Sequence, residues 1–129
     1  MKVTGRELLA VVIGGMLGTG LRVAIDTLLP HSDREFPLST LIINVAGALV
    51  LGVLVARVWP GAPAWLRAGL GAGLLGSFTT FSALAVALVT LGPTPLAALY
   101  LGLSLLLGLG AAFLGLRLGR RAPIDLVNE

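Results

Sequence analysis

The chain has no cysteine among its 129 residues. Disulfides, thiolate metal sites and cysteine nucleophiles are therefore excluded. Charge is also scarce, because charged residues make up 12% of the sequence, whereas soluble domains contain about 25%. In their place, 57% of the residues are hydrophobic and the mean hydropathy is +1.01. This balance indicates an integral membrane protein.

Four apolar segments account for most of the sequence. Each is at least as long as the roughly 20 residues that a helix needs to cross the hydrocarbon core, and proline-rich loops separate them. We therefore expect an all-α integral membrane protein in which residues 1–129 form a single domain. The first segment is too long for a cleaved signal peptide, and no cleavage site follows it. The expected spans are residues 8–29, 38–58, 66–91 and 96–116.

Basic residues are concentrated on one side of these spans. Most fall on the side that holds both termini and the second loop, and Arg34 lies on the opposite side. Because basic residues favour the cytoplasmic face, we expect a multi-pass protein of the cell membrane with both termini in the cytoplasm. The same topology explains the basic excess without a nucleic-acid partner. The residues on the first side are Lys2, Arg6, Arg57, Arg67, Arg117, Arg120 and Arg121.

Small residues recur four positions apart on the expected helices. This spacing lines one helix face with small side chains and lets two backbones approach closely. The pattern fits packing within one subunit as well as contact between subunits. Four short helices enclose little space by themselves, so we expect an oligomer. The pairs are Gly14 and Gly18, Ala48 and Gly52, Gly69 and Gly73, and Gly115 and Gly119.

Arg22 lies inside the first expected helix, towards its end. An arginine at the bilayer centre costs about 2.5–3.5 kcal/mol by insertion scales, so its charge needs a partner or water. One interpretation is an ion pair with Asp26, one turn later, or snorkelling to the headgroups. The other is a positive charge in a water-filled vestibule, where it would concentrate anions.

The remaining polar side chains of interest within the spans are amides and hydroxyls. A path lined by hydrogen-bond donors suits an anion, whereas cation and proton pathways more often contain an intramembrane Asp or Glu. Asn44 can also bridge two helices, and the i, i+4 spacing of Tyr100 and Ser104 places them on one helix face. The set comprises Asn44, Thr79, Thr80, Ser82, Tyr100 and Ser104.

The stretch "GLLGSFTTFS" (73–82) interrupts the third span with glycine and hydroxyl residues. Unwound backbone is tolerated at membrane depth only where protein, water or an ion satisfies its polar groups. Carbonyls freed by a helix break hold Na⁺ in some transporters, so a break at "GSFTT" predicts a site for a hard cation. The rings of Phe78 and Phe81 could offer their electropositive rims to an anion nearby.

Three stretches resemble the signature segments of the Fluc (CrcB) fluoride channels: "GGMLGTGLR" (14–22), "STLIINVAGALVLG" (39–52) and "GLLGSFTTFSAL" (73–84). The resemblance implies an antiparallel dimer of four-helix subunits in the membrane, with two fluoride pores at the interface. It also implies passive export of F⁻ that reduces cytoplasmic fluoride toxicity.

The resemblance carries roles over to individual residues. The backbone carbonyls of Gly76 and Thr79 from each subunit would bind a structural Na⁺ at the dimer centre, and Arg22 would belong to the aqueous vestibule. The residues that would line or shape the ion pore are Asn44, Thr80, Phe81, Ser82, Tyr100 and Ser104.

Two positions depart from the family pattern. Leu84 stands where the family usually has a second phenylalanine, and Gly108 stands where it often continues the hydroxyl track. The one-sided basic residues also favour a single orientation. These features favour one half of a heterodimer with an oppositely oriented homologous subunit, and a homodimer remains the other possibility.

Three other functions fit the sequence less well. A small multidrug-type exporter would need a membrane-embedded glutamate in the first helix, and residues 8–29 contain none. A non-conducting assembly subunit would explain Leu84 and Gly108. An enzyme is not expected, because the single histidine, His31, has no nucleophile or metal partner at a recognisable spacing.

Overall fold

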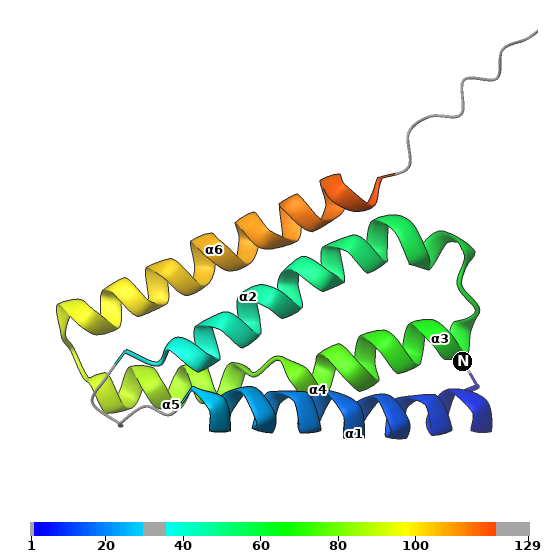
Figure 1. Cartoon of the computed structure of the whole chain (residues 1–129), viewed down its shortest axis with the longest axis horizontal. Helices are drawn as coiled ribbons and strands as arrows, with labels where there is room; N and C mark the ends of the chain where they lie inside the picture. Colours follow the sequence, from blue (N-terminus) through cyan, green and yellow to red (C-terminus); the bar gives the residue numbers. More distant parts are fainter. Residues whose placement is uncertain (1, 30–35, 121–129) are drawn as a thin grey trace, which may run out of the picture.

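The computed structural model describes residues 2–29 and 36–120 of the chain. His31, Arg34 and Arg121, which the sequence analysis singled out, lie outside these residues. The described residues form helices joined by short turns, with no strand among them. Figure 1 shows the helices side by side along one long axis, with α1 next to the segment from α3 to α5, then α2, then α6.

Four helical segments of 24 to 28 residues are long and apolar enough to cross a membrane. The third is interrupted after α4, so the expected all-α fold with a broken third helix is confirmed. The segments are α1 (Gly5–Leu28); α2 (Leu38–Val53) continued by η1 (Leu54–Val58) and η2 (Trp59–Gly61); α3 (Ala64–Ala68), η3 (Gly69–Leu75), α4 (Gly76–Phe78) and α5 (Phe81–Leu91); and α6 (Pro95–Gly119).

The helix ends follow local sequence signals. Thr4 and Glu7 form a capping box at the start of α1, in which each side chain accepts a hydrogen bond from the other residue's backbone N–H. Thr94 caps α6 through a bond from the Ala97 N–H, and Pro95 occupies the first helical position. Gly92, with φ +66°, follows the last residue of α5 in a conformation that favours glycine.

Glycine lets the helices pack as two close pairs. On α1, a Cβ added at Gly14 or Gly18 would overlap the backbone of η3 at Gly69 or Leu74. Between α2 and α6, an added Cβ at Gly52 would overlap the Ala112 carbonyl, and α6 has the same constraint at Gly115. The small-residue spacing therefore serves packing within the subunit at these positions.

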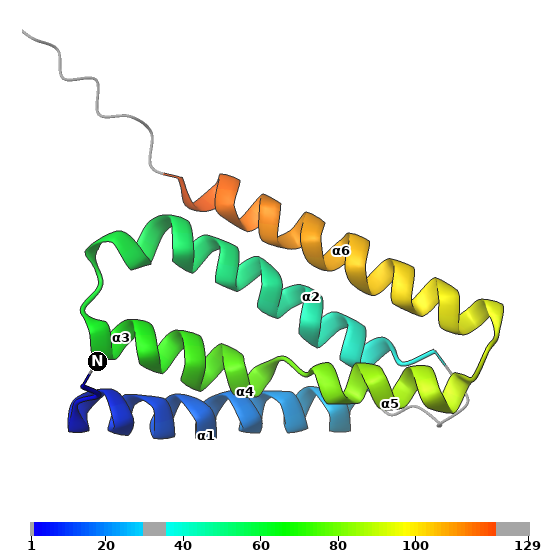
Figure 2. The ribbon, with the colours of Figure 1, turned by 180° about the vertical axis from the view of Figure 1, so that it is seen from behind.

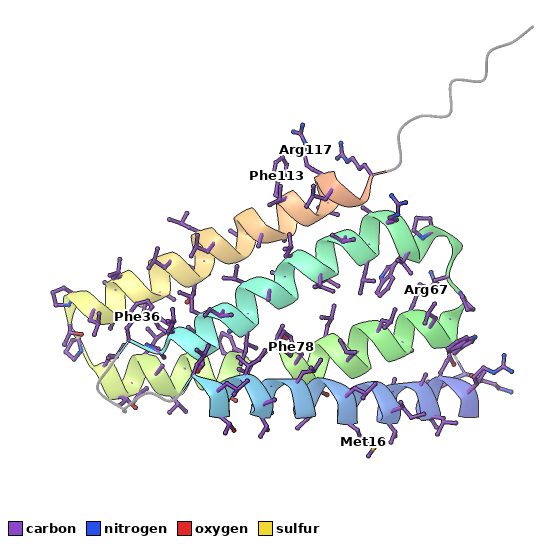
Figure 3. The ribbon with its side chains drawn as sticks, viewed as in Figure 1. Met16, Phe36, Arg67, Phe78, Phe113 and Arg117 are labelled. Atoms are coloured by element: carbon purple, nitrogen blue, oxygen red, sulfur yellow. The ribbon has the colours of Figure 1, made fainter. Side chains whose placement is uncertain are left out.

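The interior is small, and most large apolar side chains face outwards. Ile43, Leu75 and Phe78 form a buried cluster, and Figure 3 shows Phe78 pointing between the helices. Met16 and Phe113 point away from the bundle in the same view and are 71% and 60% exposed. An apolar exterior of this kind suits lipid, and the chain is a multi-pass membrane protein.

Candidate functional site

The break in the third membrane segment is two residues long. Thr79 and Thr80 have extended backbones, with ψ 157° at Thr79 and φ −148°, ψ 118° at Thr80. Helix α5 then starts at Phe81. Figure 2 shows this non-helical connection between α4 and α5 alongside α2. The break occurs within the "GSFTT" stretch, where the sequence predicted it.

Asn44 on α2 binds the break through both ends of its side-chain amide. Its Oδ1 accepts a hydrogen bond from the Thr80 N–H at 2.9 Å, and its Nδ2 donates to the Thr80 carbonyl at 3.0 Å. We call this pair of hydrogen bonds the Asn44 clasp. The predicted ability of Asn44 to bridge helices is thus realised, with the backbone of the break as its partner.

Arg22 on α1 contacts α4 just before the break. Its Nε donates to the Ser77 carbonyl at 3.2 Å, while Asp26 accepts a hydrogen bond from the Ser39 hydroxyl at 2.8 Å. Arg22 and Asp26 therefore each have a different hydrogen-bonding partner, and the structure does not support the ion pair that the sequence suggested. In a continuous helix the Ser77 carbonyl would accept from the Phe81 N–H. The break removes that donor, so the carbonyl can accept from Arg22 instead.

The break diverts the backbone donors of two further carbonyls. In a continuous α-helix the Thr80 N–H would bond to the Gly76 carbonyl and the Ala83 N–H to the Thr79 carbonyl. The Thr80 N–H bonds to Asn44 instead, and the Ala83 N–H bonds to the Thr80 hydroxyl at 3.1 Å. Gly76 and Thr79, the two predicted metal ligands, are thus the residues whose carbonyls lose these regular donors.

A groove of about 540 Å³ opens beside the break, between α2 and the third membrane segment. It brings together five of the residues that the sequence analysis named for metal or ion contact, and it also includes Leu84. We call it the break groove. It is lined by Asn44, Gly47, Ala48, Leu51, Gly71, Leu75, Gly76, Thr79, Thr80, Phe81 and Leu84.

The two phenylalanines that flank the threonines have different environments. Phe78 is 9% exposed and packs in the buried cluster, whereas Phe81 is 80% exposed at the edge of the break groove. The extended residues between them rotate the second ring out of the interior. Of these two rings, only that of Phe81 is therefore exposed on the outer side of the break groove.

The remaining predicted pore residues lie outside the lining of the break groove. Ser82 is exposed, and its hydroxyl lies 3.4 Å from that of Thr80. Tyr100 is fully buried and packs edge-on against Phe36, with ring centroids 5.3 Å apart. The Ser104 hydroxyl donates to the Tyr100 carbonyl at 2.7 Å.

Within residues 2–29 and 36–120, the buried Tyr100 hydroxyl has no hydrogen-bonding partner. A buried donor of this kind would gain a hydrogen bond from water or an anion. Gly108 lies one helical turn beyond Ser104 on α6, and the space around it is open, because nothing lies within 4 Å of an added Cβ.

Gly47 is a site residue that sequence reasoning missed. A Cβ added there would overlap the Thr79 side chain and lie 3.5 Å from the Phe78 ring. The absence of a side chain on α2 therefore makes room for the break. The available signal was a glycine one helical turn after Asn44, although the sequence does not reveal what lies opposite.

These features define a four-span membrane protein with a polar break in its third span. The family described as "CrcB-like protein, Camphor Resistance (CrcB)" matches residues 9–116. The chain belongs to this family, which confirms the resemblance seen in the sequence.

Three relatives illustrate the similarity. The "Fluoride-specific ion channel FluC" of Azotobacter vinelandii is 43% identical over 114 residues, which cover 84% of this chain and 92% of the relative. The protein of the same name from Rhodospirillum centenum is 42% identical over 124 residues (91% and 98%). "Fluoride-specific ion channel FluC 2" of Halalkalibacterium halodurans is 40% identical over 118 residues (89% and 87%).

Proposed function

We propose that this chain is a subunit of a fluoride-specific channel that lets F⁻ leave the cytoplasm passively. The names and extensive similarity of the FluC relatives support this function. In the structure, the observation that carries it is the break groove, where hydroxyl and amide groups lie beside the exposed Phe81 ring and no carboxylate is present among the lining residues. The amide and hydroxyl donors and the electropositive rim of the ring suit an anion.

The break groove is the face on which a second subunit would sit. Phe81 is 80% exposed at the edge of this groove. An oppositely oriented subunit would cover the groove and place a second break against the first. Each of the two resulting pores would be lined or shaped by Asn44, Thr80, Phe81, Ser82, Tyr100 and Ser104. The positive charge of Arg22, beside Ser77, would attract anions to the nearby vestibule.

A structural Na⁺ at the dimer centre is part of this proposal. Na⁺ is a hard cation that prefers oxygen ligands, and helix breaks supply them as carbonyls. The carbonyls of Gly76 and Thr79 fit because their helical donors are diverted and both residues line the break groove. Within the described part of the chain, no cluster of His, Cys, Asp or Glu offers another metal site. The bound ion would neutralise carbonyl dipoles that otherwise face one another.

The partner is either a second copy or a homologous subunit of opposite orientation. In the structure the start of α1, the turn from η1 to α3 and the end of α6 lie at one end of the bundle (Figure 1), and they carry Arg6, Arg67 and Arg117. This charge bias favours one orientation with cytoplasmic termini, and hence a heterodimer. Some relatives carry a number in their name, such as FluC 2, which is consistent with organisms that have more than one such subunit.

Deletion of the gene for this chain in its own host tests the function, because any natural partner subunit is then present. External HF crosses the membrane and dissociates at neutral pH, so F⁻ accumulates inside unless a channel releases it. We expect the deletion strain to accumulate fluoride and stop growing at a fluoride level that the parent tolerates, with chloride tolerance unchanged. Equal fluoride sensitivity of the two strains would contradict the proposal. An exporter of organic cations would instead change drug sensitivity.

A further inference from the structure

Four of the carbonyls around the helix break differ in what they bind. Those of Ser77 and Thr80 accept hydrogen bonds from side chains of other helices, namely Arg22 on α1 and Asn44 on α2. Those of Gly76 and Thr79 have lost the backbone donors that a regular helix would supply. Side chains from two neighbouring helices therefore occupy the Ser77 and Thr80 carbonyls, and neither of these bonds reaches Gly76 or Thr79.

Asn44 has the larger influence because it engages the donor as well as the acceptor of Thr80. The Thr80 N–H is the group that would close onto the Gly76 carbonyl if the helix continued. By accepting that N–H at 2.9 Å, Asn44 Oδ1 removes the competitor for the Gly76 carbonyl. The second bond, from Nδ2 to the Thr80 carbonyl at 3.0 Å, fixes the orientation of the extended residue.

We propose that Asn44 is a positioning residue for the cation site, and that it keeps the Gly76 carbonyl available by holding Thr80 in the clasp. This inference rests on the Na⁺ site of the proposed function. It assigns Asn44 a task beyond lining the pore, and the two tasks make different predictions. A residue that only lines the pore affects fluoride flux, whereas a positioning residue also affects the affinity for Na⁺.

The test measures the thermal stability of the purified full-length protein in detergent as Na⁺ replaces N-methyl-D-glucamine. A ligand that binds only the folded state raises the melting temperature in a concentration-dependent manner. Loss of an outer-shell partner typically lowers metal affinity about 10–100-fold. We therefore expect Asn44→Leu to raise the Na⁺ concentration needed for half-maximal stabilisation by about this factor.

Two variants make the comparison specific. Asn44→Asp retains an oxygen that can accept from the Thr80 N–H, which is the bond that keeps the Gly76 carbonyl free, so it should bring the midpoint back towards that of the parent. Ser104→Ala removes a predicted pore hydroxyl that donates to the Tyr100 carbonyl, away from the break. It should leave the Na⁺ midpoint unchanged whatever it does to fluoride flux.

An unchanged Na⁺ midpoint in Asn44→Leu would overturn the positioning role. If this variant does not fold, amide exchange in the parent protein decides the question. The clasp predicts slow exchange of the Thr80 N–H in Na⁺-free buffer, and exchange as fast as in exposed turns would overturn it. A parent protein that Na⁺ does not stabilise would refute the cation site and this inference together. Absence of fluoride flux alongside Na⁺-dependent stability would refute only the channel function.

Discussion

At the residue scale, the proposed contact with the anion depends on Phe81. Its ring is 80% exposed beside hydroxyl groups, so the positive rim of the ring quadrupole is available to an anion. Phe78, only three residues earlier, is buried against Ile43 and Leu75. The two rings have the same chemistry, and the extended backbone of the break separates a buried ring from an exposed one.

Phe81→Leu should therefore lower fluoride flux while leaving the fold intact. Specific aromatic contacts contribute about 0.5–1.5 kcal/mol, which corresponds to roughly a two- to tenfold reduction in flux. Fluoride release from proteoliposomes measures the effect. Phe113→Leu is the matched control, because Phe113 is exposed on α6 and points away from the bundle (Figure 3). Equal flux from all three proteins would contradict the role of Phe81.

Gly47 provides a second prediction at this scale. Its α carbon faces the Thr79 side chain so closely that a methyl group would overlap it. Gly47→Ala should displace Thr79 and lower Na⁺-dependent stabilisation, measured as the shift in melting temperature on adding Na⁺. Gly102→Ala is the control, because nothing lies within 4 Å of a Cβ there. A full Na⁺ shift in the Gly47 variant would show that the break tolerates the displacement.

At the scale of elements, hydropathy predicted the helices because the bilayer fixes the length of each span. The break was also predictable, because adjacent hydroxyl residues and glycine in an apolar segment need partners at membrane depth. The partners themselves were not predictable. Asn44 and Thr80 are 36 residues apart and Arg22 and Ser77 are 55 apart, so only the packing of the helices brings them together.

Helix pairing explains why so many glycines sit on α1 and the third segment. Gly18→Leu places a side chain where α1 meets the Leu74 carbonyl, so it should separate the two helices. Overpacking of this kind costs about 1–3 kcal/mol or more, and the thermal unfolding temperature in detergent should fall clearly. Gly20→Leu on the same helix has nothing within 4 Å of its Cβ and should change that temperature little. Equal destabilisation by both substitutions would argue against the close packing.

At the scale of the whole molecule, orientation distinguishes a homodimer from a heterodimer. The basic residues at one end of the bundle should hold both termini in the cytoplasm, so two identical copies would seldom meet in opposite orientations. Tags at both termini, probed with an impermeant label in intact cells, should reveal a single inward population. Comparable inward and outward populations would instead support an antiparallel homodimer.

The most direct test of the central claim is anion release from liposomes that contain the complex purified with any partner subunit. Vesicles loaded with the potassium salts of fluoride and chloride are diluted into a salt lacking both anions. A potassium ionophore then lets K⁺ leave with the anion, so that no membrane potential opposes its release, and ion-selective electrodes follow each anion. The proposed function predicts rapid fluoride release while chloride stays inside. Release of chloride as readily as fluoride, or of neither anion, would contradict it.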